Sequence, residues 1–507
     1  MHDRTHMLCR RKELIYMSKL TDFLKTLPNP KEFASFGVYE KSYNQLKDDH
    51  IFIIKEEGND LIVVTGSSMK NFKGEKRTLN QLDYLIAQTD HDNINALRNL
   101  FPYMKPKPVL REKRSFGLGD RLGLAGEGHL KALLAYDAYP VLAQQSMREL
   151  TLTNRTYSDV LDAASLAVYK MGYKRGFGAD GDHLKTEKDI KYALDTGFTM
   201  ITLDTSDHIR NDVESLSIEQ IDQEVNLTEN DKKKYLNKTF NIQGHQISFT
   251  ELELKKAILI YQDSIEYTTH IYHQFFKGNQ GVDLELSIDE TATKTELNHH
   301  LYIANELAEK GVHLTTIAPR FHGEFQKGID YIGNTHIFQE ELKVHVAIAE
   351  HYGYKLSIHS GSDKFSIFEI IGKETKGHFH VKTAGTNWLV AAHLVAIKDP
   401  LLYREIHQKA LDTFEQAKKL YHVTTHIENI PAIDQLSDEE LPKLFENNDA
   451  RQLIHITYGY ILNDKNNDGT YKFKDRLYHL WTQYSDLYAT MLKEHIGKHL
   501  ELLYKGF

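Results

Sequence analysis

Residues 356–365, LSIHSGSDKF, begin as a buried strand and end in groups that are costly to bury. Leu356 and Ile358 alternate with polar residues, as in a strand that has one face in a core. A histidine, two serines, an aspartate and a lysine follow at once. A strand that leaves a core and delivers polar side chains to a site has this pattern, and it gains weight if other strands end in the same way.

Seven more segments resemble it between residues 109 and 386, where short apolar runs alternate with helical stretches. This alternation is typical of βα units around a parallel sheet. The predicted strands are 114–119, 139–144, 173–179, 198–204, 282–289, 312–318, 354–359 and 378–383. Eight parallel strands close a (β/α)₈ barrel of the TIM type, so we predict an α/β fold with a catalytic barrel at residues 109–386.

The rest of the chain is predicted to surround this barrel. Residues 1–108 read as an N-terminal extension and a small α/β unit, because HIFIIKEEGNDLIVVTG (50–66) has the pattern of a hairpin. The charged stretch 207–280 after the fourth strand is predicted to be a helical insertion, and residues 387–507 a helical C-terminal region.

Composition excludes several classes of protein. The net charge of -9 and the pI near 6.3 leave no basic field for nucleic acid or an anionic membrane. Cys9 is the only cysteine, which excludes an intrachain disulfide and a cysteine-based zinc site. No apolar run approaches the ~20 residues that span a bilayer, and the amino terminus lacks a secretory signal, so we expect a cytoplasmic protein that could form a homo-oligomer.

Two further motifs were weighed and set aside. The glycine-rich FGLGDRLGLAG (116–126) lacks the acidic residue and strand–helix context of a dinucleotide site. DKNNDGTYKFKD (464–475) fits most of a calcium loop, but its twelfth residue is Asp475 instead of glutamate, and Asn-Asp-Gly is also a common turn.

The carboxyl ends of the predicted strands carry an unusual number of acids, bases and amides. The active site of a barrel forms at this face, where the loops converge on the axis. The residues at or just beyond the strand ends are Asp120, Arg121, Gln144, Gln145, Arg148, Asp182, His183, Lys185, Asp204, Asp207, Glu285, Asp289, Glu290, Arg320, His322, Glu324, His359, His380 and Lys382. We therefore expect an active site at this face.

Histidine and carboxylate without cysteine suit a catalytic divalent metal such as Zn²⁺, Mn²⁺, Ni²⁺ or Co²⁺. The best ligand candidates are His183, His322 and His359, each at a strand end and beside groups that could orient it. His345 and His351 lie on a helical stretch and are expected to be structural.

Three carboxylates are candidates for acid/base chemistry. Asp182 and His183 are adjacent, but Gly181 and a loop position would let both reach the mouth, with Asp182 as the base. In the fifth strand, alternation places Glu285 and Asp289 together on the face toward the barrel interior, where either could be the second group.

Six ordered segments together resemble the tagaturonate epimerase (tagaturonate/fructuronate epimerase) family, in which members acting on neutral ketohexoses such as tagatose and fructose look alike at this level. The segments are FGLGDRLGLA (116–125), AQQSMREL (143–150), GFGADGDHLKT (176–186), TMITLDTSD (199–207), ELSIDET (285–291) and IAPRFHGEFQKGIDY (317–331). The resemblance implies a metal-dependent barrel enzyme of hexuronate catabolism. It implies Asp182 as proton acceptor, a carboxylate of ELSIDET as proton donor, and metal ligands at His183, His322 and His359.

The implied reaction inverts a carbon β to the ketone, whose hydrogen is not acidic. Retro-aldol cleavage with re-addition, or a shuttle of proton transfers between two bases, would each do so, and the sequence leaves both open. A metal-dependent aldolase or aldose–ketose isomerase on the same barrel is the rival interpretation.

The implied sugar-acid substrate requires cations for its carboxylate. The predicted substrate-binding residues are Arg121, Gln145, Arg148, Lys185, Arg320 and Lys382.

Overall fold

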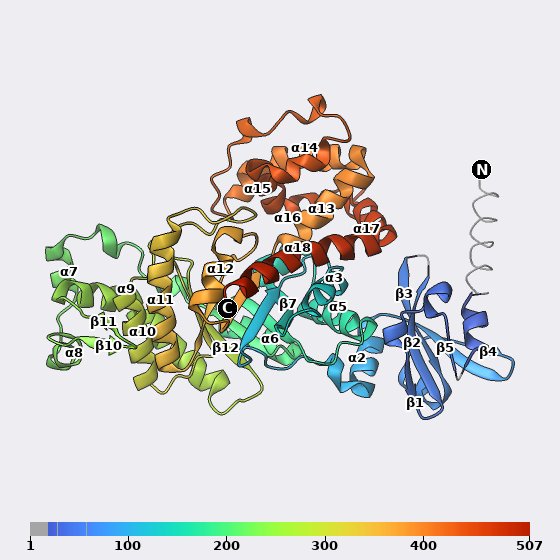
Figure 1. Ribbon diagram of the computed structural model, residues 1–507, viewed down its shortest axis with the longest axis horizontal. Helices are drawn as coiled ribbons and strands as arrows, with labels where there is room; N and C mark the ends of the chain where they lie inside the picture. The colour runs from blue at the N-terminus through green and yellow to red at the C-terminus, as the bar shows by residue number, and fades with distance from the viewer. Residues whose placement is uncertain (1–18, 28, 57) are drawn as a thin grey trace.

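A computed structural model describes residues 19–27, 29–56 and 58–507 (Figure 1); Cys9 lies outside these ranges. Eight parallel strands form a closed barrel in the order β12-β13-β14-β15-β6-β7-β8-β9. Their bounds are β6 (Arg114–Leu118), β7 (Tyr139–Ser146), β8 (Gly178–Leu184), β9 (Met200–Asp204), β12 (Asp283–Ile288), β13 (Thr316–Pro319), β14 (Lys355–Ile358) and β15 (Phe379–Thr383). The predicted (β/α)₈ fold is confirmed.

The third strand begins later than predicted. The sequence indicated 173–179, whereas β8 runs over Gly178–Leu184. Its residues Asp180 and Asp182 point into the barrel, where Lys382 of β15 pairs with both. Buried charges require pairing, so a segment with two aspartates is read as a loop when no partner is known. Here the partner is Lys382, some 200 residues away in the chain.

A five-stranded antiparallel sheet precedes the barrel and lies at one end of the molecule in Figure 1. Its strands are β1 (Asn44–Leu46), β2 (Asp49–Glu56), β3 (Asn59–Thr65), β4 (Glu75–Leu79) and β5 (Leu82–Gln88), in the order β1-β2-β3-β5-β4. Strands β2 and β3 form the predicted hairpin. Helix α2 (His91–Leu100) packs against α5 (Tyr157–Lys170), which joins this sheet to the barrel.

The charged insertion after β9 is largely helical, as predicted. It contains α7 (Ile218–Glu224), α8 (Glu229–Tyr235), a hairpin of β10 (Phe240–Ile242) with β11 (His245–Ile247), and α9 (Glu251–Ile271). Helix α9 packs against α10 (Leu297–Glu309), and its apolar residues join the core of the barrel. The long helix of the insertion therefore serves as part of the outer ring.

The other ring helices follow their strands. They are α3 (Gly126–Leu133), α4 (Met147–Thr153), α5, α6 (Glu187–Thr196), α10, α11 (Thr335–Tyr352) and α12 (Phe365–Glu374). Side-chain caps begin α4, α5, α6 and α11; Ser146, for example, caps α4 in a capping box with Glu149. None of the helices in the described ranges is at once long enough and apolar enough to cross a bilayer.

The last helix of the chain completes the ring. Helix α18 (Ser485–Lys505) packs against both α12 and α3, and Ile496, Leu500 and Leu503 enter the core of the barrel. Helix α13 (Thr386–Lys398), which follows β15, instead enters a second core. That core includes Trp388 and residues of α14 (Pro400–Lys418), α15 (Asn448–Ile456), α16 (Tyr458–Leu462) and α17 (Lys474–Gln483).

Asp363, in the loop after β14, joins this C-terminal region to the barrel mouth. One of its carboxylate oxygens lies 2.6 Å from Nη2 of Arg451, and the other lies 2.6 Å from Nε2 of His495. Its amide donates to Nε2 of His499 at 2.9 Å. The cationic partners hold the pKa of the buried Asp363 far below its usual range, although burial alone would raise it.

Replacing this anchor should destabilise the protein. Asp363→Asn leaves Arg451 without its anionic partner in a mostly buried position, so we expect the free energy of unfolding to fall by about 3 kcal/mol. Urea denaturation followed by circular dichroism measures the change. The control Asp468→Asn, on an exposed turn, should keep the wild-type midpoint. Equal midpoints for both variants would show that Asp363 does not anchor the loop.

Candidate active site

Lys382 of β15 lies among three carboxylates inside the barrel. Its ammonium nitrogen is 2.5 Å from Asp182, 2.7 Å from Asp180 and 3.2 Å from Glu285. Burial alone would lower the pKa of Lys382, but the three acids raise it well above its usual value. The same ammonium holds the pKa of Asp182 below its usual range against the effect of burial. The acid that the sequence predicts as the base is therefore a carboxylate at neutral pH.

Glu285 of β12 is fully buried and fully hydrogen-bonded. The register of the parallel strands places it opposite Thr202 of β9 and Thr316 of β13, and both hydroxyls donate to it, at 3.1 and 2.6 Å. Nε2 of His359 lies 2.7 Å from its Oε1. Its side chain faces the interior, as the alternation of the strand predicted.

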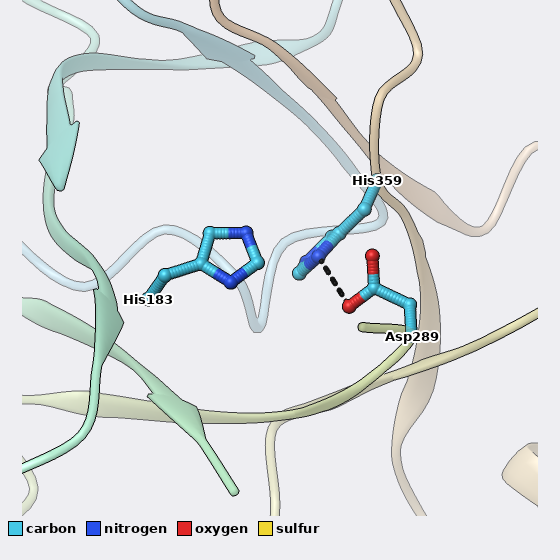
Figure 2. Close-up of side chains that lie close together, drawn as sticks. All are labelled: His183, Asp289 and His359. Carbon is cyan, nitrogen blue, oxygen red and sulfur yellow. Dashed lines mark hydrogen bonds and ion pairs between the residues drawn. The ribbon is translucent and has the colours of Figure 1, made fainter. Parts of the chain in front are cut away.

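His183 and His359 face each other across the mouth, with ring centroids 5.1 Å apart (Figure 2). His183 reaches this position because the pairing of β8 with β9 shifts register between Gly181 and Leu184, and the backbone of His183 takes a positive φ of 52°. This irregularity lets Asp182 and His183, adjacent in sequence, contribute to one site. A bulge within β8, instead of the predicted loop, brings both side chains to the mouth of the barrel.

Carboxylates orient both imidazoles. Nδ1 of His359 lies 3.1 Å from Asp289, an interaction drawn in Figure 2, and Nδ1 of His183 lies 3.4 Å from Asp204. Burial opposes protonation of His183, but Asp182 and Asp204 raise its pKa to about 10. Such anionic surroundings favour a positive charge at this place, whether a proton or a cation supplies it.

The donor set fits a divalent metal. Ligand atoms of His183, Asp289 and His359 all lie within 4.8 Å of one another, and so do those of His183, Asp204 and Glu290. Imidazole with carboxylate suits Zn²⁺, Mn²⁺, Ni²⁺ or Co²⁺. His322 belongs to neither group among the described residues; it lies in the loop after β13, where its carbonyl accepts from Tyr331.

Four of the six predicted substrate-binding residues already have acidic partners within the protein. Arg121 is buried against Glu149 at 2.9 Å, Lys185 pairs with Asp207 at 2.7 Å, and Arg320 lies 3.9 Å from Glu324. Lys382 is enclosed by the acids described above. Gln145 lines neither cavity at the mouth, whereas its neighbour Gln144 lines the smaller one.

Arg148 faces the open part of the site. It lines both a cavity of about 680 Å³ and an adjoining one of about 40 Å³, with its guanidinium over the ring of Tyr421. Glu290 and Lys327 line both cavities as well. Neither residue had a predicted role, although both lie in segments that carry the family resemblance: Glu290 in ELSIDET (285–291) and Lys327 in IAPRFHGEFQKGIDY (317–331).

The closed barrel, with acids and imidazoles gathered at the carboxyl ends of its strands, places the protein in the class of (β/α)₈ barrel enzymes. A sequence profile of the tagaturonate epimerase family matches residues 39–503. The chain belongs to the tagaturonate epimerase family and is an epimerase, an enzyme of the isomerase class. The resemblance seen in the six sequence segments is confirmed.

Known proteins similar to this chain agree in fold and in name. It is 40% identical over 476 residues to the tagaturonate/fructuronate epimerase of Thermotoga maritima, covering 92% of this chain and 97% of that protein. A glycerol-complexed crystal structure of the fructuronate-tagaturonate epimerase of Cohnella laeviribosi matches with a TM-score of 0.89 and 45% identity, covering 92% and 96% of the two chains. A structure of the same enzyme with two glycerols matches with a TM-score of 0.90 and 44% identity, over 96% and 99%.

Removal of the central ammonium should unfold the site. Lys382→Met leaves three buried carboxylates without their shared cation, so we expect a loss of about 3 to 5 kcal/mol in the free energy of unfolding. Denaturant titration measures it. Lys191→Met, which removes an exposed partner of Asp195, is the matched control and should cost less than about 0.5 kcal/mol. A Lys382→Met protein as stable as the control would contradict the central role of this ammonium.

Proposed function

We propose that this protein interconverts tagaturonate and fructuronate with the help of a bound divalent cation. One observation carries the proposal: His183 and His359 lie together with three acids at the mouth of a barrel of this family. The acids are Asp204, Asp289 and Glu290. The names of the relatives supply the substrate pair. Tagatose and fructose are the neutral counterparts of this pair.

The cation would be held by His183 and His359 and by a third group. The grouping of ligand atoms favours Asp289 for that place, whereas the sequence favours His322, so both are candidates. When bound, the cation supplies positive charge that stabilises negative charge developing on the substrate's oxygens.

Asp182 is the proposed proton acceptor. It lines the small cavity together with His183 and His359, and Lys382 keeps it ionised. In a retro-aldol step Asp182 takes the proton of the hydroxyl on the carbon β to the ketone. The bond between that carbon and the carbon α to the ketone then breaks, which leaves an aldehyde and an enediolate. The aldehyde turns over, the bond re-forms on its other face, and the new alkoxide receives a proton.

If His322 completes the ligand set of the cation, Asp289 remains available for proton transfer and is better placed than Glu285 to return that proton. Glu285 is enclosed by Thr202, Thr316, Lys382 and His359 and lines neither cavity at the mouth. Asp289 lines the large cavity. Glu285 is then a positioning residue that holds His359, while Asp289 works at the surface that a substrate touches.

The substrate assay tests both reaction and route. Purified protein with Mn²⁺, Ni²⁺ or Zn²⁺ should convert tagaturonate to fructuronate, detected by chromatography. In D₂O the product should carry no deuterium on carbon, because the retro-aldol route moves only hydroxyl protons. Carbon-bound deuterium would favour the two-base shuttle instead. Three-carbon fragments would identify an aldolase, and an aldose would identify an isomerase of the rival kind.

Metal analysis tests the ligand set. His359→Ala should lose bound metal, because removal of a group that only orients a ligand costs about 10- to 100-fold in affinity and a ligand should cost more. Inductively coupled plasma mass spectrometry of the purified variant gives the content. His351→Ala, on the exposed end of α11, is the control and should keep the wild-type content.

The same measurement decides the third ligand. Loss of metal in Asp289→Ala but not in His322→Ala would select Asp289, and the converse would select His322. Wild-type content in His359→Ala, or full activity after chelation, would remove the metal from the proposal.

A further inference from the structure

Lys327 lies at the junction of the two cavities at the barrel mouth. The large and the small cavity share Arg148, Glu290, Lys327, His359, Ser360 and Tyr421 in their walls. The small cavity also contains Asp182 and His183, so Lys327 and the proposed reacting groups line one space. A substrate held by the histidines would extend toward Lys327.

Within the described ranges Lys327 forms no ion pair at 4.0 Å or closer. Its ammonium donates to Oγ of Ser360 at 2.9 Å, and the carboxylates that act on it, Glu290 and Glu149, do so from farther away. Arg148 is similar: it donates to the carbonyl of Leu420 and lies over Tyr421, and in the described part of the chain it forms no ion pair, with Glu290 and Glu149 acting on it only from a distance. These two cations differ from Arg121, Lys185 and Lys382, which are matched by acids of the protein itself.

An ammonium in this position is costly without an anion. Burial lowers the pKa of Lys327, and the nearby guanidinium of Arg148 lowers it further, whereas Glu290 and Glu149 oppose this only in part. A carboxylate bound beside the two cations would favour the charged form of Lys327. The site is thus electrostatically suited to a further anionic group.

The backbone around Lys327 is held in place. The carbonyl of Lys327 accepts from Nε2 of Gln452, and the carbonyl of Gly328 accepts from Nε of Arg451 at 2.7 Å. The buried ammonium of Lys364 donates to the carbonyls of Gln326 and Ile329, at 2.8 and 2.6 Å. Because helix α15 and Lys364 fix this loop, little conformational freedom is lost when the lysine meets a ligand.

The geometry points to Lys327, with Arg148 beside it, as the group that binds the carboxylate of a sugar-acid substrate and distinguishes it from a neutral ketohexose. The carboxylate of a ketohexuronate lies at the end of the chain opposite the ketone, so the histidines and Lys327 would hold opposite ends. This role rests on the proposed function, since it requires a uronate in the site.

Substitution of Lys327 tests the role. Lys327→Met keeps the length of the side chain and removes its charge. The KM for tagaturonate should rise about 10- to 100-fold with little change in kcat, as expected for loss of a hydrogen bond to a charged group. Lys327→Arg should restore most of the affinity, and Lys191→Met, on the exposed face of α6, should behave as wild type.

Neutral ligands separate charge recognition from general damage. Inhibition constants are measured for a six-carbon hexonate and for the corresponding hexitol. Lys327→Met should weaken the hexonate about 10- to 100-fold and leave the hexitol unchanged.

An unchanged KM for tagaturonate in Lys327→Met, or equal weakening of both inhibitors, would overturn the assignment of Lys327 while leaving the epimerase reaction intact. A wild-type enzyme that does not convert tagaturonate would instead overturn the proposed function itself.

Discussion

One buried ammonium organises the inside of this barrel. Lys382 is the common partner of Asp180, Asp182 and Glu285, which come from two other strands. In a low-dielectric interior such acids could not share a space without it, because each unpaired charge would cost several kcal/mol or force protonation. The ion cluster fixes the strands that carry it, and it keeps Asp182 ionised at the point where β8 opens to the mouth.

His183 and His359 link the buried ion cluster to the mouth of the barrel. Glu285 binds both Lys382 and His359, so the position of the histidine depends on the same buried cluster. His183 enters by the irregularity in β8 and is directed by Asp204. The cations inside the barrel are therefore ion-paired, whereas toward the opening Arg148 and Lys327 form no ion pairs with the described residues and have Glu290 only at a longer distance. This distribution of charge suits an anionic substrate whose carboxylate lies toward the opening of the barrel.

The C-terminal region supports the site from outside. Helix α18 packs between α12 and α3 and so takes the place in the ring that α13 leaves. Asp363 ties the loop that follows His359 to Arg451 and His495. Arg451 and Gln452 of α15 also hold the backbone around Lys327. The loops that bear the reacting groups thus depend on helices from the end of the chain, which places functional side chains on a fixed frame.

The sequence by itself determined the class of fold and the family, and it predicted the face on which the candidate site lies. Apolar runs with polar ends predict barrel strands, because the direction of a side chain follows from its place in the local pattern. The segment LSIHSGSDKF (356–365) is an example of such a strand end. Local pattern also placed Glu285 on the interior face. It could not show that β8 begins at Gly178, since the aspartates of that strand are acceptable only beside Lys382. Nor could it separate Arg121, ion-paired with Glu149, from Lys327, which forms no ion pair in the described part of the chain. Tertiary structure alone decided these points, because the free energy of a buried charge depends on which distant charges lie within a few ångströms of it.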